Sequence, residues 1–295
     1  MELLHSIASI RSPFLDFLIG LITRLGEEEL ILVVICVAFW CVNKLFAYKA
    51  GIVFFLSGIT VQSLKITFRV DRPWVKDPGF NAVPSAMERA TGYSFPSGHT
   101  QAGGSLFGAL GAEFNKTPLK IASFAIVLLI AFSRMYLGVH TLTDVLVSVF
   151  VTMLLVFIVF WRLNEDSFTG RQVLVLAVII IAYAVAAIIY AAVLYSRGII
   201  EIAYLTDCLK AAGAAIGFAA GMYVESTYIK FSVKAKNLLF QAIKFVIGFA
   251  GVMILKEGLK LVIGVSPVAD VIRYFLFVFW VFAPYPLIIK RFFHV

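Results

Sequence analysis

Long apolar runs dominate this chain of 295 residues and constrain its fold more than any other feature. A helix of about 20 apolar residues crosses the hydrocarbon core of a bilayer, and runs of about that length recur along nearly the whole sequence. Hydrophobic residues make up 61% of the chain and charged residues 14%, against about 45–50% and 25% in a typical soluble domain. The sequence therefore excludes a soluble globular enzyme and predicts an all-α, polytopic transmembrane helical bundle.

The apolar segments predict about nine membrane helices with mostly short connections. The expected spans are residues 30–47, 49–65, 99–114, 119–135, 142–161, 172–195, 204–224, 238–256 and 271–289. Residues 13–25 are short and carry Asp16 and Arg24, so we expect an interfacial helix there and not a span. The one long polar connection covers residues 67–98, and a loop of that length in a compact bundle is usually functional.

The charge pattern fits a membrane protein better than a nucleic-acid-binding one. Lys and Arg number 25 and Asp and Glu 17, for a formal net charge of +8, but the basic residues are spread between apolar segments. We therefore expect no nucleic-acid partner. Short basic loops favour the cytoplasm, and here they contain Lys44, Lys49, Lys116, Lys120, Arg162, Arg171, Lys230, Lys234, Lys236, Lys290 and Arg291. Residues 67–98 would then face the exterior or periplasm.

The cysteines give no sign of a disulfide framework or a metal site. Cys36, Cys41 and Cys208 lie within or at the ends of apolar stretches, without metal-ligand spacing. We expect free, buried thiols and no disulfide framework.

Three polar clusters stand out in the sequence, and two of them lie at the ends of the long loop. Charged groups are costly near lipid unless they are paired, so such clusters need an explanation. The first cluster consists of Lys65, Arg69, Asp71, Arg72, Pro73 and Trp74. Snorkelling of its basic side chains to lipid headgroups is the alternative to a functional role. The second, residues 93–100, leads into a glycine-rich helix whose first turn offers N–H groups and a positive dipole end to an anion. A plain helix cap at Ser97 is the alternative.

The third cluster consists of Ser133, Arg134, His140 and Asp144. His140 and Asp144 are four residues apart, so on one helix they would share a face, and the carboxylate would hold an imidazole N–H. Such a pair leaves the other ring nitrogen free to attack or to accept a proton, although a histidine with a satisfied partner is also common as a structural element. Two spans separate this cluster from the long loop, so all three clusters can meet at one membrane face. Their cations, imidazoles and helix start together point to a tetrahedral oxyanion such as phosphate.

These residues form a pattern known from one enzyme family. Lys65 with Arg72-Pro73, Pro96-Ser97-Gly98-His99, and Ser133-Arg134 followed by His140 and Asp144 resemble the three motifs of the type 2 phosphatidic acid phosphatase superfamily. That superfamily also contains bacterial acid phosphatases, vanadium haloperoxidases and glucose-6-phosphatase. The resemblance covers about residues 30–195.

The resemblance implies a lipid phosphate phosphatase with the following roles. His140 is similar to the family's nucleophile, which forms a phosphohistidine, and Asp144 would orient it. His99 would protonate the leaving group and then activate water. The residues implied to surround the phosphoryl oxygens are Lys65, Arg72, Ser97, Gly98 and Arg134.

The resemblance also sets expectations for cofactors, substrate and location. With these cations present we expect no metal and no other cofactor, and inhibition by vanadate. The substrate would be a membrane lipid in the bilayer: phosphatidic acid, phosphatidylglycerol phosphate, a sphingoid-base phosphate or a polyprenyl diphosphate such as the undecaprenyl carrier, with a slight preference for a polyprenyl diphosphate or a phosphoglycerolipid. We expect a multi-pass protein of the bacterial plasma membrane with its active site facing the periplasm or exterior.

The resemblance divides the chain into an interfacial region (residues 1–29), a catalytic core of about six helices (residues 30–197) and about three additional spans (residues 198–295). In the last part, Asp207 and Lys210 are three apart and could pair, whereas Lys244 has no obvious partner in its own helix. Gly213, Gly217 and Gly221 form a face for close helix packing, either within the chain or in a homodimer. A transporter or binding protein for an anionic lipid is the alternative function, but we see no internal repeat of the kind many carriers show.

Overall fold

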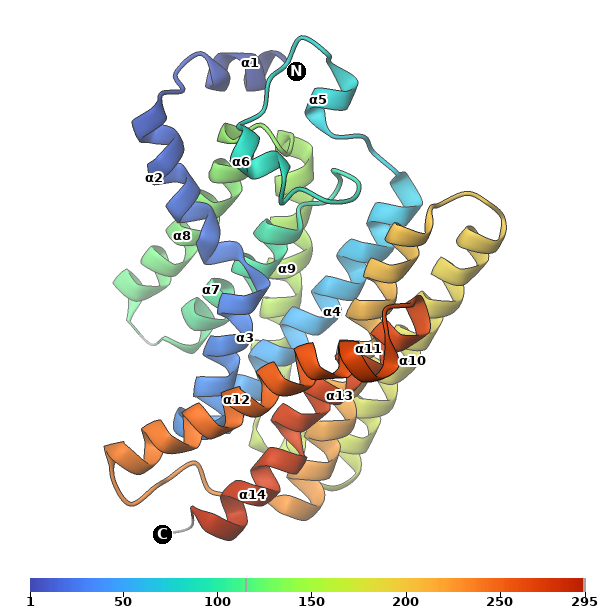
Figure 1. Ribbon diagram of the computed structural model, residues 1–295. Coiled ribbons are helices and arrows are strands. Elements are labelled where there is room, and N and C mark those ends of the chain that lie inside the picture. Colours follow the sequence, from blue (N-terminus) through green and yellow to red (C-terminus); the bar gives the residue numbers. More distant parts are fainter. Residues whose placement is uncertain (115, 294–295) are drawn as a thin grey trace. The chain divides into compact units, whose positions relative to one another are not determined.

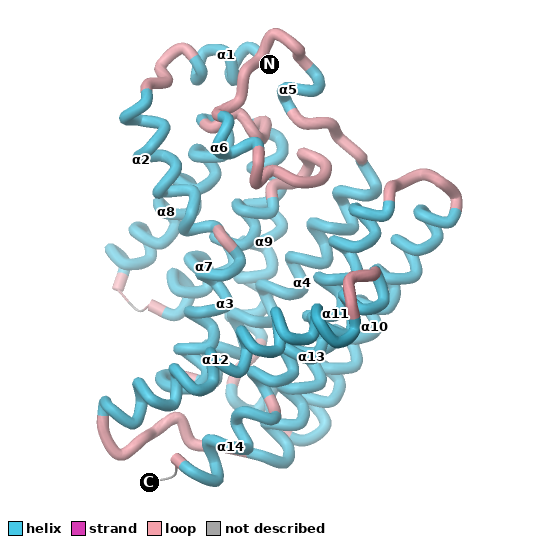
Figure 2. The backbone as a smooth tube through the Cα atoms, in the orientation of Figure 1, coloured by secondary structure: helices cyan, strands magenta, loops and turns pink. Residues whose placement is uncertain are grey.

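The computed structural model describes residues 1–114 and 116–293, and every regular element in these ranges is a helix (Figures 1 and 2). The α-helices are α1 (Glu2–Ala8), α2 (Pro13–Thr23), α3 (Glu28–Val37), α4 (Lys44–Phe68), α5 (Pro73–Lys76), α6 (Pro84–Met87), α7 (Gly98–Glu113), α8 (Thr117–Tyr136), α9 (Leu142–Arg162), α10 (Gly170–Ser196), α11 (Ile202–Val224), α12 (Leu238–Ile263), α13 (Pro267–Phe282) and α14 (Pro284–Phe292). Short 3₁₀ or π-helical segments are η1 (Arg24–Gly26), η2 (Ala38–Val42), η3 (Glu165–Phe168) and η4 (Glu225–Ile229). The predicted all-α class is confirmed.

Seven stretches of the described chain are long and apolar enough to cross a membrane. They are Lys44–Lys76, Thr117–Tyr136, Leu142–Arg162, Gly170–Ser196, Ile202–Ile229, Leu238–Ile263 and Pro267–Phe292. The outward face of α9 shows what such a helix presents to lipid, because Leu146, Phe150, Phe157 and Trp161 are all more than half exposed. Exposed apolar faces on hydrogen-bonded helices are what a bilayer requires. The protein is a multi-pass integral membrane protein.

Two of the nine expected spans are too short in the structure. The segment predicted at residues 30–47 is α3, of 10 residues, followed by η2 and an extended residue at Asn43 that separates it from α4. The segment predicted at residues 99–114 is α7, of 16 residues, which the extended Phe114 ends. At about 1.5 Å per residue, a helix of that length falls short of a hydrocarbon core of about 30 Å. Hydropathy alone does not predict these helix ends at Asn43 and Phe114.

The described chain separates into two compact units. Unit 1 contains Met1–Leu32 and Thr60–Trp161, and unit 2 contains Val33–Ile59 and Arg162–Val295, so the boundaries fall within α3, within α4 and before the last residue of α9. The sequence-based division at residues 29 and 197 stays a prediction. All residues proposed for catalysis lie in unit 1.

In unit 1 the N-terminal region forms hydrogen bonds with, and packs against, the part of the chain that contains the polar clusters. Arg11 donates from Nε to the Tyr136 carbonyl at 2.8 Å and from Nη1 to the Asn81 carbonyl at 2.5 Å. A Cβ on Gly26 would lie 2.6 Å from the His99 carbonyl oxygen, so only glycine allows η1 to approach the first turn of α7 this closely. Figure 1 shows α2 beside α8. The N-terminal region is therefore part of the wall of unit 1.

In unit 2, α11 packs closely along α13 through its small residues. A Cβ on Gly213 would lie 2.5 Å from the Val271 carbonyl oxygen, and one on Gly221 would lie 2.5 Å from the Cβ of Phe282. The glycine face is thus filled from within the chain, as the packing interpretation predicts. These glycines do not offer a surface to a second copy, so the alternative of a homodimer contact loses this support.

Buried charges of unit 2 have identifiable partners. The buried Glu225 accepts from the Lys44 Nζ at 2.8 Å and from the Phe231 amide at 3.0 Å, and also from the Tyr48 hydroxyl. Lys244 donates to the Val233 carbonyl at 2.8 Å, outside its own helix. The predicted Asp207–Lys210 pair is confirmed at 3.4 Å. The cysteines are free thiols, as expected, with Cys36 and Cys208 buried and Cys41 partly buried.

Candidate active site

The three polar clusters come together in unit 1 at one end of α4, α7, α8 and α9. Lys65 lies in the last turn of α4 and Arg72 just before α5, whereas Ser97 caps the start of α7. Arg134 lies in the last turn of α8, and His140 lies between α8 and α9. Two helices, α7 and α8, lie between the second and third clusters and return the chain to the same end, although α7 is too short to be one of the two spans that the sequence predicts.

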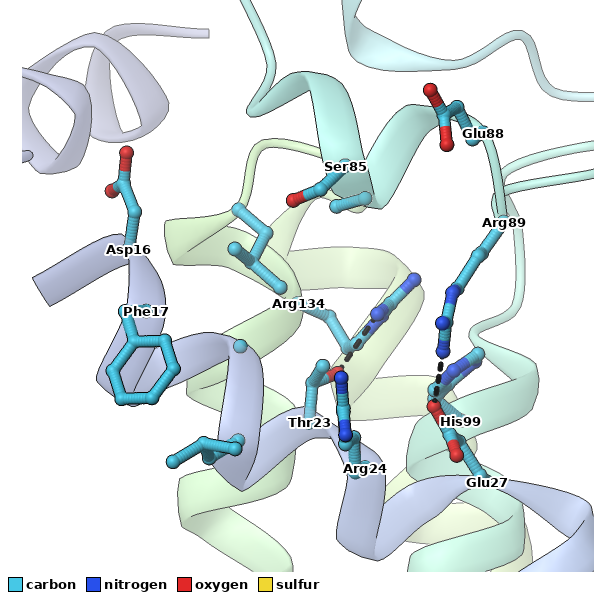
Figure 3. Close-up of a pocket in the computed structure, with 14 residues that line it drawn as sticks. Asp16, Phe17, Thr23, Arg24, Glu27, Ser85, Glu88, Arg89, His99 and Arg134 are labelled. Atoms are coloured by element: carbon cyan, nitrogen blue, oxygen red, sulfur yellow. Dashed lines mark hydrogen bonds and ion pairs between the residues drawn. The ribbon is translucent and has the colours of Figure 1, made fainter. Parts of the chain in front are cut away.

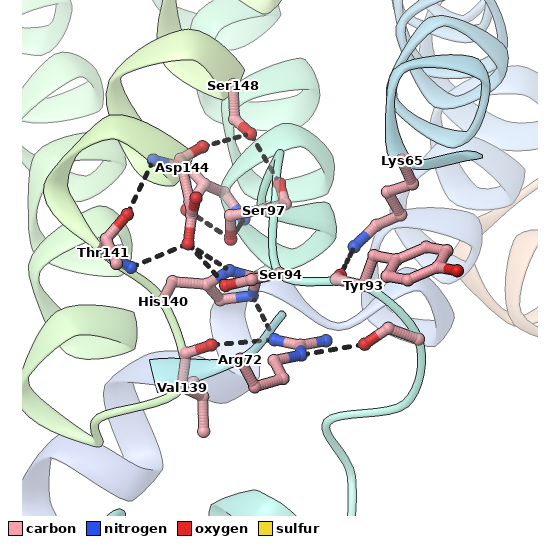
Figure 4. A network of polar contacts seen from close by, with 12 residues as sticks. Lys65, Arg72, Tyr93, Ser94, Ser97, Val139, His140, Thr141, Asp144 and Ser148 are labelled. Carbon is pink, nitrogen blue, oxygen red and sulfur yellow. Dashed lines mark hydrogen bonds and ion pairs between the residues drawn. The ribbon is translucent and has the colours of Figure 1, made fainter. Parts of the chain in front are cut away.

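His140 faces the carboxylate of Asp144 at the centre of a polar network (Figure 4). Its Nδ1 lies 3.5 Å from Asp144 Oδ2, and both side chains are almost fully buried. The same oxygen accepts from the Ser94 hydroxyl at 2.5 Å and from the Thr141 amide at 2.8 Å. A carboxylate held this firmly can orient the ring and favour a proton on Nδ1, which leaves Nε2 with its lone pair.

His140 and Asp144 do not meet on one face of a helix, although their separation of four residues indicates that arrangement. Helix α9 begins at Leu142, so His140 precedes it and the two residues do not share a helix face. The turn brings them together because the Asp144 carboxylate accepts from the Thr141 amide while the Thr141 hydroxyl accepts from the Asp144 amide at 3.4 Å. Before this turn, shortly after the end of α8, Gly138 adopts the left-handed conformation with a φ of 78°, which glycine tolerates without strain.

Arg72 lies against the free nitrogen of His140. Its Nη1 is 3.0 Å from His140 Nε2 and also donates to the Val139 carbonyl at 2.8 Å. The other guanidinium nitrogens donate to the Gly92 carbonyl at 3.0 Å and the Thr91 carbonyl at 2.7 Å. Backbone carbonyls thus fix a cation beside the candidate nucleophile. Lys65 is fixed in the same way by the Tyr93 carbonyl at 2.5 Å.

Ser97 and Gly98 link α7 to α9. The Ser97 hydroxyl accepts from the Thr100 amide at 3.3 Å and from the Thr100 hydroxyl at 2.9 Å, so the helix-cap interpretation of Ser97 is correct. Its backbone N–H donates to the Asp144 carbonyl at 3.1 Å. The Ser97 hydroxyl hydrogen remains a donor, and Gly98 begins the first turn of α7, where N–H groups lack helical partners.

His99 and Arg134 line a pocket of about 250 Å³ (Figure 3). Arg134 donates from Nη1 to the Thr23 hydroxyl at 2.8 Å, and its buried Nε has no partner among the described residues. Across the pocket, Arg89 and Glu27 form an ion pair at 2.8 Å. The full lining is Asp16, Phe17, Gly20, Leu21, Thr23, Arg24, Glu27, Ser85, Ala86, Glu88, Arg89, His99, Arg134 and Leu137.

The predicted site residues therefore fall into two groups. His99 and Arg134 line the pocket, and Lys65, Arg72 and the His140–Asp144 pair belong to the adjoining network. Burial and the positive charges of Arg134 and Arg72 lower the pKa of His99 to about 3. Burial and Arg72, with a smaller effect of Arg134, also bring the pKa of His140 well below its usual value. Because the same arginines act on both imidazoles, the two groups form one strongly cationic site with neutral histidines.

Sequence reasoning missed the contribution of the N-terminal region. Thr23, Arg24 and Glu27 come from a segment that we expected to be interfacial, and Arg89 comes from the long loop without a recognisable motif. Ser94, which holds Asp144, stands within the second cluster, and its place beside the motif is the only sequence signal for it. Among residues 1–114 and 116–293, no group of three or more His, Cys, Asp or Glu residues could hold a metal ion.

Comparisons with known proteins match two parts of the chain. A model of the PAP2 superfamily matches residues 46–168, and one described as "PAP2 superfamily phosphatase, transmembrane extension" matches residues 209–294. A protein of Dictyostelium discoideum named "Probable sphingosine-1-phosphate phosphatase" is 30% identical over 166 residues, which are 51% of this chain and 39% of that protein. The chain thus matches about two fifths of its relative's length. No solved structure matches it.

Proposed function

The chain belongs to the PAP2 superfamily, and from this premise we propose that it removes phosphate from a membrane lipid through a phosphohistidine on His140. The observation that carries the proposal is the arrangement around this ring. Asp144 lies at Nδ1, and the fixed guanidinium of Arg72 lies at Nε2. A neutral imidazole so oriented is a nucleophile, and the cation beside it marks the place of the phosphoryl oxygens.

In the first step, His140 Nε2 attacks phosphorus while the bond from phosphorus to the leaving oxygen breaks. His99 donates a proton to that oxygen, so that a neutral lipid alcohol leaves, or, in the case of a diphosphate, the lipid monophosphate with the proton on its released oxygen. In the second step, His99 accepts a proton from water, whose oxygen attacks phosphorus and releases His140. A phosphoenzyme thus separates two easier displacements.

Substrate binding has to change two interactions. The Arg72 Nη1 now lies against Nε2, so attack requires this N–H to turn to a phosphoryl oxygen, which is a stronger, charged acceptor. His99 is neutral in the empty site because its pKa is lowered to about 3. A bound phosphate offsets Arg134 and Arg72, raises that pKa and allows His99 to hold the proton it must donate.

The cations of the site make a divalent metal unnecessary in this proposal. Lys65, Arg72 and Arg134 supply three positive charges around the transferring group, and the Ser97 hydroxyl and Gly98 amide add donors. Activity should therefore persist in excess chelator. Vanadate should inhibit because it takes the trigonal bipyramidal geometry of the transition state.

The pocket supports a lipid substrate without selecting one. Phe17 and Leu21 of α2 give it an apolar side, and both are well exposed, as side chains next to a lipid tail would be. The name of the Dictyostelium relative adds weight to a sphingoid-base phosphate. Phosphatidic acid, phosphatidylglycerol phosphate and undecaprenyl diphosphate stay as the other candidates.

The experiment is phosphate release by the full chain in mixed micelles with excess chelator, using each of these four lipids. His140→Ala is the test variant, and His5→Ala, outside the site, is the matched control. We expect release from at least one lipid by the wild type and by the control, and none by His140→Ala. Release that survives in His140→Ala would refute the mechanism, and binding of a lipid without release by any form would favour an anionic-lipid carrier.

We also propose that the active site faces the exterior or periplasm, because the loops at the opposite ends of α8 and α9 belong to the basic, short set. Single cysteines in a cysteine-free chain test this orientation. A membrane-impermeant maleimide should label Lys76→Cys in intact bacterial cells and should leave Lys120→Cys unlabelled until the cells are lysed. The reverse pattern would place the site in the cytoplasm.

A further inference from the structure

Unit 2 contains a second pocket that is separate from the proposed catalytic residues. Its volume is about 350 Å³, and it lies where α11 and α13 begin and α12 ends. The lining residues are Lys210, Lys256, Lys260, Val265, Asp270, Arg273, Tyr274 and Phe277. Four of these eight side chains are cationic and one is acidic, so the pocket wall is strongly positive.

The buried guanidinium of Arg273 is the feature that points to a ligand. Arg273 is 4% exposed and pairs through Nη2 with the equally buried Asp270, one turn earlier on α13. Its Nε and Nη1 have no hydrogen-bond partner among the described residues. A buried, unsatisfied charged donor is costly, so native proteins rarely leave one without a partner. An acceptor bound in the pocket that Arg273 lines would satisfy these two donors.

The lysines at the rim are held only weakly by acids outside the pocket. Lys260 pairs with Glu257 at 2.7 Å and Lys210 with Asp207 at 3.4 Å, and all four side chains are substantially exposed. Exposed pairs of this kind contribute little free energy, so the ammonium groups can turn to a stronger anion at small cost. Neither Glu257 nor Asp207 lines the pocket.

The surroundings indicate where such an anion would come from. Leu261, Val262 and Val265 at the end of α12 are each more than three quarters exposed, as lipid-facing side chains would be. Lysines directly beside an apolar surface are typical of sites for anionic lipid headgroups. The lining of the pocket contains no histidine, serine, threonine or cysteine, so it fits binding without hydrolysis by a phosphohistidine mechanism.

We propose that this pocket binds one phosphate-type oxyanion, with Arg273 Nε and Nη1 as its central donors and Lys256 and Lys260 at the rim. The source of the oxyanion is either the headgroup of an anionic lipid or free phosphate. Charge-assisted hydrogen bonds from a guanidinium to such a group are short and strong, and they satisfy the donors that the protein leaves open. The proposal is independent of the phosphatase reaction.

The test is native mass spectrometry of the full chain released from bilayers of phosphatidylcholine mixed with phosphatidylglycerol. Phosphatidylglycerol carries a phosphodiester and is not a phosphomonoester substrate, so retention reports on binding only. We expect one retained phosphatidylglycerol in the wild type and at least about tenfold weaker retention in Asp270→Asn/Arg273→Gln, which removes the buried pair without leaving a lone charge. Retention equal to the wild type in a folded double variant would overturn the proposal.

A second pair of variants keeps the test valid if the buried double variant fails to fold. Lys256→Gln/Lys260→Gln removes two rim charges and should weaken retention, whereas the control Lys234→Gln/Lys236→Gln, with the same charge change elsewhere in unit 2, should not. Equal loss in both would indicate a general charge effect and would contradict a specific site. Added inorganic phosphate distinguishes the sources: displacement of the lipid identifies a site for free oxyanions, and no displacement identifies a headgroup site.

Discussion

The buried charges of the two units are organised differently. In unit 2, the buried carboxylate of Glu225 neutralises Lys44 and also accepts from the Phe231 amide. In unit 1, the network has one carboxylate, that of Asp144, and three cationic side chains that backbone carbonyls and a hydroxyl hold in place. These are Lys65, Arg72 and Arg134. Carbonyls and hydroxyls orient a cation without cancelling its charge. Paired charges of this kind stabilise a fold, whereas a fixed surplus of positive charge prepares a binding site for an anion.

The largest expected effect is a loss of kcat in unit 1 without a loss of stability. His140→Ala should lower kcat by at least about a thousandfold, because no other described group in the network can replace Nε2 as nucleophile. The melting temperature should change little, since Ser94 and Thr141 still satisfy the Asp144 carboxylate. Phosphate release and thermal unfolding of the same preparation check both statements. A large loss of stability with normal kcat per folded molecule would make the network structural and would break the comparison.

The next effect tests the surplus charge itself. Arg72→Gln should reduce kcat/KM by about a hundredfold to a thousandfold, because it removes a preorganised donor from the transferring phosphoryl group. Steady-state kinetics on the preferred lipid measure this change. Arg69→Gln, in the same cluster but exposed, is the matched control and should retain most of the activity. If both variants were equally active, the guanidinium of Arg72 would have only a structural role.

In unit 2 the expected effect is on stability. Glu225→Gln should lower the free energy of unfolding by about 2 kcal/mol, because Lys44 and the Phe231 amide lose a charged acceptor. The kcat per folded molecule should stay unchanged. Chemical denaturation in micelles, combined with the phosphatase assay, measures the two quantities. A fall in kcat without loss of stability would show that unit 2 also takes part in catalysis.

A smaller effect follows from the neutral histidines of unit 1. The pKa of His99 is lowered to about 3 and that of His140 lies well below its usual value, whereas both are about 6.5 in an unfolded chain. The unfolded chain therefore takes up protons that the folded chain cannot, and stability should fall as the pH drops below about 6.5. Melting temperatures from pH 7 to pH 5 measure this slope. It should be shallower in His99→Gln and with inorganic phosphate present, and an unchanged slope in both would contradict the low pKa values.

The smallest expected effect concerns the ion pair across the pocket. Glu27→Gln removes a negative charge from the pocket wall and frees Arg89, so KM for an anionic lipid should fall by about twofold to fivefold with little change in kcat. The effect should shrink at high salt because both side chains are partly exposed. Kinetics at two salt concentrations check it. A rise in KM would mean that Glu27 itself binds the substrate.

The spacing of residues predicted the parts of the site that depend on local sequence. The site residues Lys65, Arg72, Arg134 and the His140–Asp144 pair lie where helices begin or end, and the reversal of the chain between α7 and α8 brings those ends to one side, although α7 is too short to be a span. The sequence predicted the contact between His140 and Asp144, but it did not predict the local structure that forms this contact. The pair depends on a turn closed by Thr141, and not on a shared helix face.

The pocket could not be predicted in the same way because it depends on tertiary contacts. Thr23 and Glu27 reach His99 and Arg134 only because Gly26 allows η1 to approach the backbone of α7. No periodicity or motif in the N-terminal region predicts the close contact between η1 and α7. The expected number of spans failed for a related reason, since hydropathy does not register the breaks at Asn43 and Phe114.

The most direct test of the central claim is to trap the phosphoenzyme. His99→Ala should still accept phosphate from a labelled lipid that has a good leaving group, but it should hydrolyse the intermediate slowly, so label should accumulate on the protein. We expect an acid-labile, base-stable phosphohistidine at residue 140, absent from the double variant His99→Ala/His140→Ala. Label that persists in the double variant, or release without any labelled protein in His99→Ala, would contradict it.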